Sequence, residues 1–268
     1  MRKVASYKPS LWRASKYRLY FNYFTSYVKA GDYQSLFASI RYMCFGRLPA
    51  RDFIAESAMG RFRIRKGTTD FQFINPAYEL KVKEYIIKNL PSFDVFIDVG
   101  ACIGEYSIWL AGLGKKCIAI EPINYLAMVR NIRLNGLDEC IMTFDCGLSN
   151  KQEYAGFVVP EGLPAASHRD LSVFPSDENS NQVWMMTLDE VLDEIGLQEG
   201  LRYLVKLDVE GMEPEVIEGA REFIRNNEVI FIYEHFPEDR LRNDKVLTRM
   251  ADFRFTDIDA MNRLAEKC

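Results

Sequence analysis

The segment VFIDVGACIGEYSIWL, residues 95–110, constrains the fold of this chain more than any other. An apolar run ends at Asp98, Gly100 follows, and Gly104 precedes a second run that contains Tyr106 and Trp109. This pattern predicts a buried strand, a tight turn and a helix. Glycine has no Cβ and adopts positive φ at little cost, so the backbone of such a turn can come close to a ligand.

The spacing of the turn argues against a dinucleotide ligand. In the fingerprint G-x-G-x-x-G, the middle glycine lies where the backbone approaches the pyrophosphate, but here Cys102 occupies that place. This disfavours a dehydrogenase. Asp98 puts a negative charge beside the pocket and favours an ammonium or sulfonium group, and Glu121 at the end of KCIAIEP is placed to bind ribose hydroxyls. S-adenosylmethionine has a cationic end that suits Asp98 and a ribose that suits Glu121. The alternative is a turn with a surface acid and no ligand.

The predicted cofactor site takes its residues from the turn and from the ends of the next two strands. They are Asp98, Gly100, Ala101, Gly104, Tyr106, Ser107, Glu121, Pro122 and Asp145.

Strand and helix patterns alternate through the rest of the chain. Strands are expected at 116–122, 140–149, 201–211, 228–235 and 253–259, and helices at 76–90, 124–136, 214–227 and 238–251. Alternation of this kind predicts an α/β fold with a doubly wound, mostly parallel sheet, which binds ligands at the carboxyl ends of its strands. A small β-hairpin is expected at 60–74, on either side of a Gly-Thr-Thr turn.

Three parts are expected: an N-terminal helical arm (1–55), a hairpin and helix leading into the core (56–90), and a cofactor-binding domain (91–268). The arm is basic although the whole chain has a net charge of −4. Its first fifty or so residues carry one acid, Asp32, against the cations Arg2, Lys3, Lys8, Arg13, Lys16, Arg18, Lys29, Arg41, Arg47 and Arg51. Apolar residues at helical spacing on both sides of Gly31 predict two short amphipathic helices. They would dock on the catalytic domain, or bind an anionic membrane surface or a polyanionic partner.

A long segment, residues 153–196, interrupts the alternation with two extended runs around a polar loop. Irregular loops of this length in a compact domain are usually lids or binding loops, so His168 and Arg169 are predicted to contact the substrate. Thr187 and Glu190 form a capping box that begins a helix, and Gly196 ends it.

Charged residues cluster where two neighbouring strands are predicted to end: Lys206, Asp208 and Glu210 after one, Glu234 and His235 after the other. Methyl transfer from a sulfonium to a hydroxyl requires in-line geometry and removal of a proton. His235 or a carboxylate could act as the base, with Lys206 or Arg169 stabilising the alkoxide. Alternatively, Asp208, Glu234 and His235 could bind Mg²⁺ or Mn²⁺. The acids could also belong to a solvated turn, and the histidine to the core.

These motifs together resemble the FkbM-type methyltransferase family. FIDVGACIGEYS, AIEP, RNIRLNG, TLDEVL, LVKLDVEGMEPEVIEGA and IYEH occur in the family's order over roughly residues 60–236, and Cys102 stands where the family commonly has Asn. The resemblance implies a Rossmann-like class I, S-adenosylmethionine-dependent O-methyltransferase that acts on hydroxyls of sugars or natural products. RKGTTDFQFI also resembles a motif of members found among surface-polysaccharide genes, which implies a glycan acceptor, free or lipid-linked.

Composition narrows the rival functions. The pI of about 5.5 is low for a nucleic-acid enzyme, and the Asn/Asp-Pro-Pro-aromatic motif used on exocyclic amines is absent, so no nucleic-acid partner is expected. An RNA methyltransferase and a non-catalytic S-adenosylmethionine-binding protein stay as alternatives. The six cysteines form no C-x-x-C pair and fit reduced core residues. With no apolar run of the ~18 residues that span a bilayer and no signal peptide, a cytoplasmic protein is expected, peripheral to the inner face of the membrane if the arm binds lipid.

Overall fold

The computed structural model describes residues 17–160, 162, 164–169, 181–196, 200–235 and 240–268. The chain divides into two compact units after Leu80, one of residues 1–80 and one of 81–268. The boundary expected at residue 55 falls inside strand β1 (Phe53–Ser57), and helix α4 (Leu80–Lys88) belongs almost entirely to the second unit. The arm and the hairpin are therefore parts of one unit.

The first unit contains the two predicted arm helices, α1 (Tyr17–Ala30) and α2 (Tyr33–Phe45). The side chain of Asp32 caps α2 by accepting a hydrogen bond from the backbone N–H of Ser35, at 3.0 Å, which satisfies one amide of the first turn. Gly46 ends α2 in the left-handed conformation.

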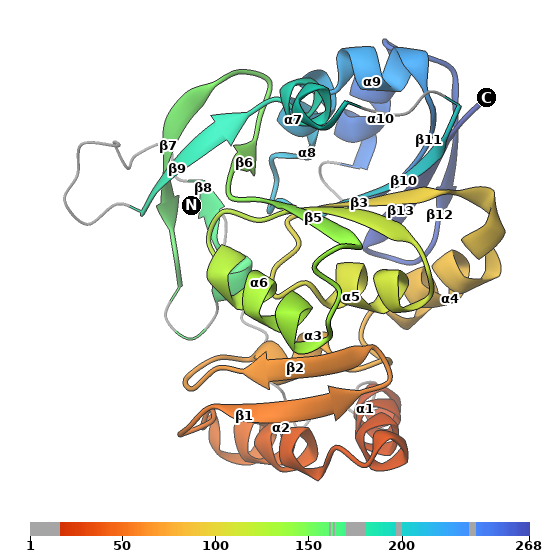
Figure 1. Cartoon of the computed structure of the whole chain (residues 1–268). Coiled ribbons are helices and arrows are strands. Elements are labelled where there is room, and N and C mark those ends of the chain that lie inside the picture. The colour runs from red at the N-terminus through yellow and green to blue at the C-terminus, as the bar shows by residue number, and fades with distance from the viewer. Residues whose placement is uncertain (1–16, 161, 163, 170–180, 197–199, 236–239) are drawn as a thin grey trace. The chain divides into compact units, whose positions relative to one another are not determined.

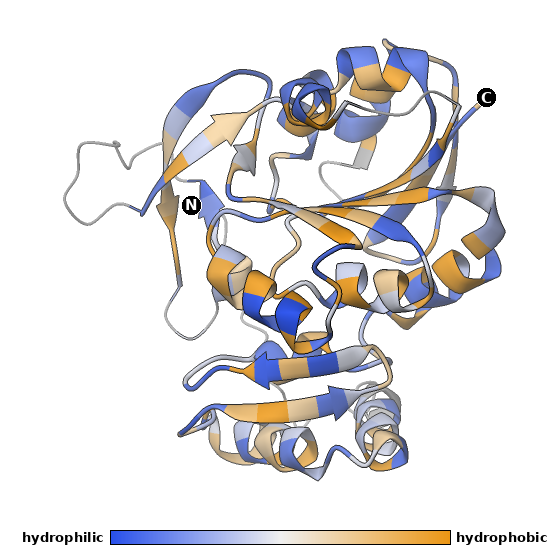
Figure 2. Ribbon diagram, in the orientation of Figure 1, coloured by the Kyte–Doolittle hydropathy of each residue, from blue (hydrophilic) through white to orange (hydrophobic). Residues whose placement is uncertain are grey.

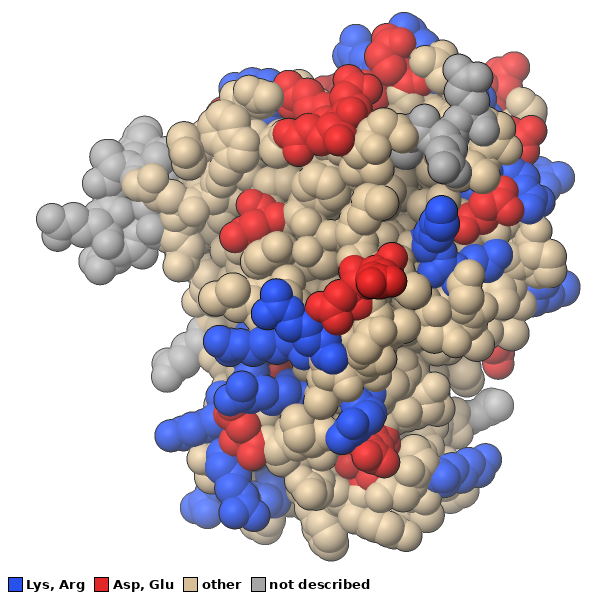
Figure 3. Space-filling view, viewed as in Figure 1, with Lys and Arg blue, Asp and Glu red and all other residues tan. Residues whose placement is uncertain are grey.

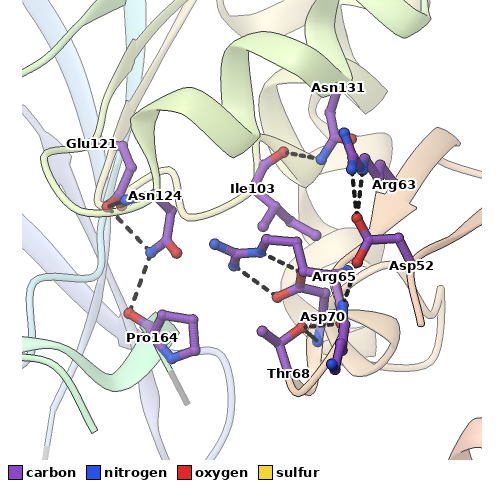
Figure 4. A network of polar contacts seen from close by, with 11 residues as sticks. Asp52, Arg63, Arg65, Thr68, Asp70, Ile103, Glu121, Asn124, Asn131 and Pro164 are labelled. Atoms are coloured by element: carbon purple, nitrogen blue, oxygen red, sulfur yellow. Dashed lines mark hydrogen bonds and ion pairs between the residues drawn. The ribbon is translucent and has the colours of Figure 1, made fainter. Parts of the chain in front are cut away.

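The predicted position of the hairpin is wrong. Strand β1 pairs antiparallel with β2 (Gly60–Ile64), so the turn lies at residues 58–59 and not at Gly67–Thr69. The residues after β2 instead lead into a short helix, α3 (Asp70–Phe73). The guanidinium of Arg65 donates two hydrogen bonds to the buried carboxylate of Asp70, at 2.7 and 2.9 Å (Figure 4). This ion pair fixes the segment that was expected to be the second strand.

Polar contacts join the helices of the first unit to its other elements. The hydroxyl of Tyr27 on α1 donates to the carbonyl oxygen of Phe71 at 2.5 Å. The side-chain amide of Asn75 donates to the carbonyl oxygen of Tyr23 at 3.1 Å. One face of the helix pair is thus packed within its own unit.

The second unit is built on a seven-stranded sheet of order β12-β13-β11-β10-β3-β4-β5 (Figure 1). Its strands are β3 (Val95–Val99), β4 (Lys116–Ile120), β5 (Ile141–Phe144), β10 (Arg202–Leu207), β11 (Glu228–Glu234), β12 (Phe253–Asp257) and β13 (Asn262–Lys267). The first five pair in parallel, whereas β13 pairs antiparallel with both β11 and β12. The doubly wound, mostly parallel sheet is confirmed, but β13 was not predicted.

Helices cover both faces of this sheet, as expected for strands that are apolar on both sides. Figure 1 shows α4, α5 (Glu105–Gly112) and α6 (Tyr125–Leu134) on one face, and α7 (Leu188–Ile195), α8 (Glu213–Glu218), α9 (Arg221–Asn226) and α10 (Arg240–Thr248) on the other. Short 3₁₀ turns lie at Leu90–Ser92 and Pro164–Ala166. In Figure 2 the central strands are predominantly apolar, in line with the buried core of β3, β10 and β11.

The helix predicted at 214–227 is two helices, because the chain bends between α8 and α9 at Gly219. A Cβ at Gly219 would lie 2.1 Å from the carbonyl oxygen of Ser149. That close approach of another segment interrupts the helix.

The interrupting segment forms a separate four-stranded sheet of order β6-β9-β7-β8. Its strands are β6 (Gly147–Leu148), β7 (Glu153–Val158), β8 (His168–Arg169) and β9 (Asn181–Met186). The single strand predicted at 140–149 is therefore divided between two sheets, β5 in one and β6 in the other. The capping box at Thr187 and the left-handed Gly196 are present as predicted.

The strand order reverses between β3 and β10. The chain runs from β3 outward to β4 and β5, and then returns to the other side of β3 as β10. Gly100 (φ +81°), directly after β3, approaches the end of β10 so closely that a Cβ would lie 2.0 Å from the carbonyl oxygen of Asp208. Only glycine fits at this crossing.

We predict that Gly100→Ala destabilises the fold much more than Gly114→Ala. Gly114 has a similar φ of +87° but no atom within 4 Å of its Cβ position, so its substitution should cost about 1–2 kcal/mol for the left-handed backbone alone. Gly100→Ala adds a clash with main-chain atoms and should cost about 4 kcal/mol or more. Urea unfolding of both variants measures the difference, and equal losses would contradict the contact.

Candidate functional site

The predicted turn after β3 is strongly left-handed. Gly100, Cys102 and Gly104 all have positive φ, +81°, +50° and +84°. Cys102 is buried, and its backbone N–H donates to Oε2 of Glu121 at 2.9 Å. The residue that replaces the middle glycine of a dinucleotide fingerprint is therefore held by the acid at the end of the next strand.

Glu121 connects three segments around the carboxyl ends of β3 and β4. Its Oε1 accepts hydrogen bonds from the backbone N–H groups of Ile123 and Asn124, at 2.8 and 2.7 Å. The side-chain amide of Asn124 in turn donates to the carbonyl oxygen of Pro164 at 3.2 Å (Figure 4). Burial raises the pKa of Glu121, and these hydrogen bonds oppose the shift. Among the described residues Oε2 accepts one hydrogen bond only, so this oxygen keeps acceptor capacity for a ligand.

Asp98 is buried at the end of β3 and accepts a hydrogen bond from the hydroxyl of Ser107 at 2.7 Å. Burial raises the pKa of Asp98 to about 6, although Lys206 and Ser107 oppose the shift. Lys206 is the register partner of Asp98 on β10, and its ammonium donates to Oδ2 of Asp208 at 2.7 Å. The predicted residues of the two strand ends thus form one charged cluster.

Two members of this cluster, Lys83 and Glu105, were not predicted from the sequence. The ammonium groups of Lys83 and Lys206 lie 5.1 and 4.9 Å from the centroid of the buried Tyr106 ring, within cation–π range. Glu105 is buried at the start of α5, and one of its carboxyl oxygens has no hydrogen-bond partner among the described residues. Burial, with the charge of Asp98, raises the pKa of Glu105 to about 8. The place of Glu105 directly after Gly104 could have revealed it, whereas Lys83 looks like an ordinary helix cation.

The loop after β10 carries a second strained residue. Glu210 has φ +53°, and the buried Glu213 accepts a hydrogen bond from the backbone N–H of Gly211 at 3.1 Å, which supports the turn. Although the Glu210 residue is exposed overall, partial burial of its carboxyl beside Asp208 and Glu213 raises its pKa to about 7. A left-handed non-glycine residue at a strand end is typical of functional loops.

A family model described as the methyltransferase FkbM domain matches residues 98–266, from the acid of the turn to the last strand. The chain belongs to the FkbM methyltransferase family.

The chain also resembles individual methyltransferases, at low sequence identity. The methyltransferase sdnD of Sordaria araneosa is 28% identical over 171 residues, which cover 52% of this chain and 64% of that protein. The crystal structure of an FkbM methyltransferase from Methylobacillus flagellatus has 20% identity and a TM-score of 0.46, over 65% of this chain and 43% of that chain. An O-methyltransferase of Bacillus cereus solved with SAH has 11% identity and a TM-score of 0.39, over 70% and 80% of the two chains. The chain thus spans less than two thirds of the length of the sdnD protein and of the Methylobacillus flagellatus chain.

Within the FkbM domain, the remaining predicted cofactor residues lie around the same loops. Ala101 is buried and its backbone N–H donates to the carbonyl oxygen of Ile120 at 3.1 Å. Pro122 follows Glu121 and is half-buried, and Asp145 follows β5 and is exposed. Their contact with a cofactor stays a prediction.

The structure brings together part of the predicted metal site. Carboxylate oxygens of Asp208 and Glu234 lie within 4.8 Å of each other, as expected for the ends of the adjacent strands β10 and β11. His235 is buried, its backbone N–H donates to the carbonyl oxygen of Met261, and it does not join these two acids in a metal-ligand group. Among the described residues of the second unit, no three His, Cys, Asp or Glu side chains assemble as a metal site. The predicted set of Asp208, Glu234 and His235 is therefore not assembled, and a bound metal ion stays a prediction.

His168 and Arg169 lie on β8 of the small sheet. Arg169 pairs with Glu153 at 2.9 Å, and Nδ1 of His168 is 3.2 Å from the carbonyl oxygen of Ala166. The core of this sheet packs against Ile123 and Val209, which follow Glu121 and Asp208 in the chain. The segment therefore adjoins both strand-end loops, and part of its predicted binding loop, 170–180, is outside the described residues.

A hollow of about 530 Å³ lies at the opposite ends of the strands, lined by the first residues of β10 and β11. Its cations already have partners. Arg202 pairs with Asp94, Arg254 with Glu266 and Arg225 with Glu222, and Lys267 donates to three backbone carbonyl oxygens. We therefore place the candidate site at the strand-end loops, where the family motif and the buried acids coincide.

We predict that Glu105→Gln flattens the pH dependence of stability. Because the folded state raises the pKa of Glu105 to about 8, its protonation favours folding, and this contribution is lost as the pH rises from about 4.5 to 8. The variant should unfold less readily than the native protein at pH 8, with a slope that differs by up to about 1.4 kcal/mol per pH unit. Urea unfolding between pH 5 and 8 measures this, with the exposed Glu139→Gln as control; parallel curves would contradict the assignment.

Proposed function

We propose that this protein is an S-adenosylmethionine-dependent O-methyltransferase that acts on a hydroxyl of a sugar or glycan, in a surface polysaccharide or a related natural product. The main support for the cofactor assignment is that two buried acids, Asp98 and Glu121, lie at the carboxyl ends of the neighbouring strands β3 and β4. The turn beside them has a side chain at residue 102, where a dinucleotide site has glycine.

The residues around the turn fit the chemistry of this cofactor. Its amino-acid end carries one ammonium and one carboxylate, and the cluster offers the acids Asp98 and Glu105 together with the ammonium groups of Lys83 and Lys206. The free acceptor capacity on Oε2 of Glu121 suits a ribose hydroxyl. When bound, the cofactor would supply an electrophilic methyl group on a sulfonium, with the neutral thioether of S-adenosylhomocysteine as the leaving group.

The protein must hold the acceptor in line with the methyl group and take up the hydroxyl proton. His235 and the carboxylates of Asp208, Glu210 and Glu234 are the bases at these strand ends, and a carboxyl whose pKa is near 7, such as that of Glu210, is well matched to the task. Lys206 would stabilise the developing alkoxide. We favour base catalysis without a metal ion.

The glycan acceptor is supported by the resemblance of RKGTTDFQFI to a motif of family members found among surface-polysaccharide genes. The small sheet supports a dedicated acceptor site, because it adjoins the loops after both β4 and β10. A segment of this kind can cover a bound acceptor and exclude water from the reaction.

The proposal predicts that surface glycans from cells lacking this protein lose one methyl group, as measured by mass spectrometry. The native gene should restore the methyl group, and Glu121→Ala should not, because this variant loses charge-assisted hydrogen bonds worth about 2 kcal/mol or more of cofactor affinity.

Calorimetry with S-adenosylhomocysteine should show that Glu121→Ala binds the cofactor product more weakly, and the exposed Asp138→Ala is the control. Unchanged binding by Glu121→Ala would overturn the cofactor site, and unchanged glycans with methylated RNA would overturn the acceptor.

If His235 accepts the proton, His235→Gln should lower turnover about 100-fold or more and leave cofactor affinity intact. Turnover with an acceptor glycan and calorimetry with S-adenosylhomocysteine measure the two effects. A chelator should leave the activity unchanged. Loss of activity with the chelator and its recovery with Mg²⁺ would instead support the metal mechanism, and activity that survives the substitution would move the role of base to Asp208 or Glu210.

A further inference from the structure

The first unit exposes a row of large apolar side chains on α1 and α2. They are Phe21 and Val28 on α1, and Tyr33, Phe37 and Phe45 on α2, and Phe37 and Phe45 are 65% and 72% exposed. Tyr33, Phe37 and Phe45 are separated by four and eight residues, so they share one side of the helix. Large exposed apolar side chains that gather on one element are typical of interaction sites.

This exposed row is not the face that packs within the unit. The buried side chains of the two helices are Tyr27, Ser35 and Ala38, and Tyr27 is bonded to Phe71 of α3. Because α1 and α2 already pack on one side, the exposed aromatics are not needed to hold the unit together.

The exposed charges of residues 20–51 are cations, whereas the exposed acids of this unit, Asp52 and Glu56, lie at β1. Lys29, Arg41 and Arg47 are exposed beside the apolar side chains, and none of them has an ion-pair partner among the described residues. Asp32 is the acid of residues 17–51, and it is buried as the cap of α2. In Figure 3 the lower part of the surface is mostly uncharged, and Lys and Arg are more prominent there than Asp and Glu.

We propose that the exposed face of α1 and α2 docks on an anionic lipid surface. Aromatic side chains enter the boundary between headgroups and acyl chains, while the surrounding cations bind lipid phosphates. The helices are each about 20 Å long, enough to lie on a membrane surface. No helix among the described residues is long and apolar enough to cross a bilayer, so the contact is peripheral.

Lipid explains this surface better than a protein partner does. A polyanionic protein or nucleic acid would be met by the cations alone and would leave Phe37 and Phe45 in water. An apolar protein groove would accept the aromatics, but would leave Lys29, Arg41 and Arg47 without anionic partners. The lipid docking does not depend on the methyl-transfer reaction; if the acceptor is a lipid-linked glycan, it would place the enzyme beside its substrate.

The test is co-sedimentation of the full-length protein with vesicles of phosphatidylcholine, alone or mixed with phosphatidylglycerol. We expect binding to the anionic vesicles, release by raised salt, and little binding to the neutral ones. Two variants should each weaken binding at least about tenfold: Phe37→Ser with Phe45→Ser, and Lys29→Glu with Arg41→Glu and Arg47→Glu. In both, S-adenosylhomocysteine binding should be unchanged, which separates this proposal from the proposed function.

Matched controls lie on the second unit. Leu126→Ser with Leu241→Ser removes apolar side chains that are 65% and 58% exposed, and Lys116→Glu with Lys245→Glu and Arg249→Glu reverses three exposed cations. Both controls should bind anionic vesicles about as well as the native protein does. Equal binding to neutral and anionic vesicles, or binding unaffected by the first-unit variants, would overturn the proposal. So would a dimer in size-exclusion chromatography that dissociates on Phe37→Ser with Phe45→Ser, since a second copy would then cover the face.

Discussion

The close approach of Gly100 to the carbonyl oxygen of Asp208 organises the second unit around its candidate site. It occurs where the strand order reverses, and it brings the turn after β3 against the loop after β10. The turn's left-handed residues follow from it, and Glu121 then links the turn to the end of β4 through Cys102. Main-chain packing and one carboxylate therefore fix the positions of the loops that would hold the cofactor and the acceptor.

The charged cluster beneath the turn is unfavourable for folding by itself. Burying Asp98 and Glu105 raises the pKa of each toward neutrality, and Lys83 and Lys206 only partly offset the loss of hydration. Buried ionisable groups with such shifts gather at functional sites. We interpret this cost as preorganisation for a ligand that itself carries both charges, which is how the amino-acid end of S-adenosylmethionine would be recognised.

The sheet and its ligand-binding edge could be predicted because each apolar strand has its own acid at or directly after its carboxyl end in the chain, and β3 is also followed by Gly100. Other features depend on contacts between distant residues. Strand β13 is polar in sequence, and it is stabilised where Arg263 pairs with Asp244 at 2.7 Å. The hairpin was misplaced because the ion pair of Arg65 with Asp70 directs the chain into a helix. Lys83 joins the cluster only through the packing of α4 beside Tyr106.

The central claim is that the loops after β3, β4 and β10 form the cofactor site. Hydrogen–deuterium exchange with and without S-adenosylhomocysteine tests it most directly. The account predicts that the ligand slows exchange in three segments, residues 98–107, 121–125 and 208–213, and leaves the amino ends of β10 and β11 unchanged. Protection confined to the hollow at 225–229 and 266–268, or no protection at any of the three loops, would contradict it.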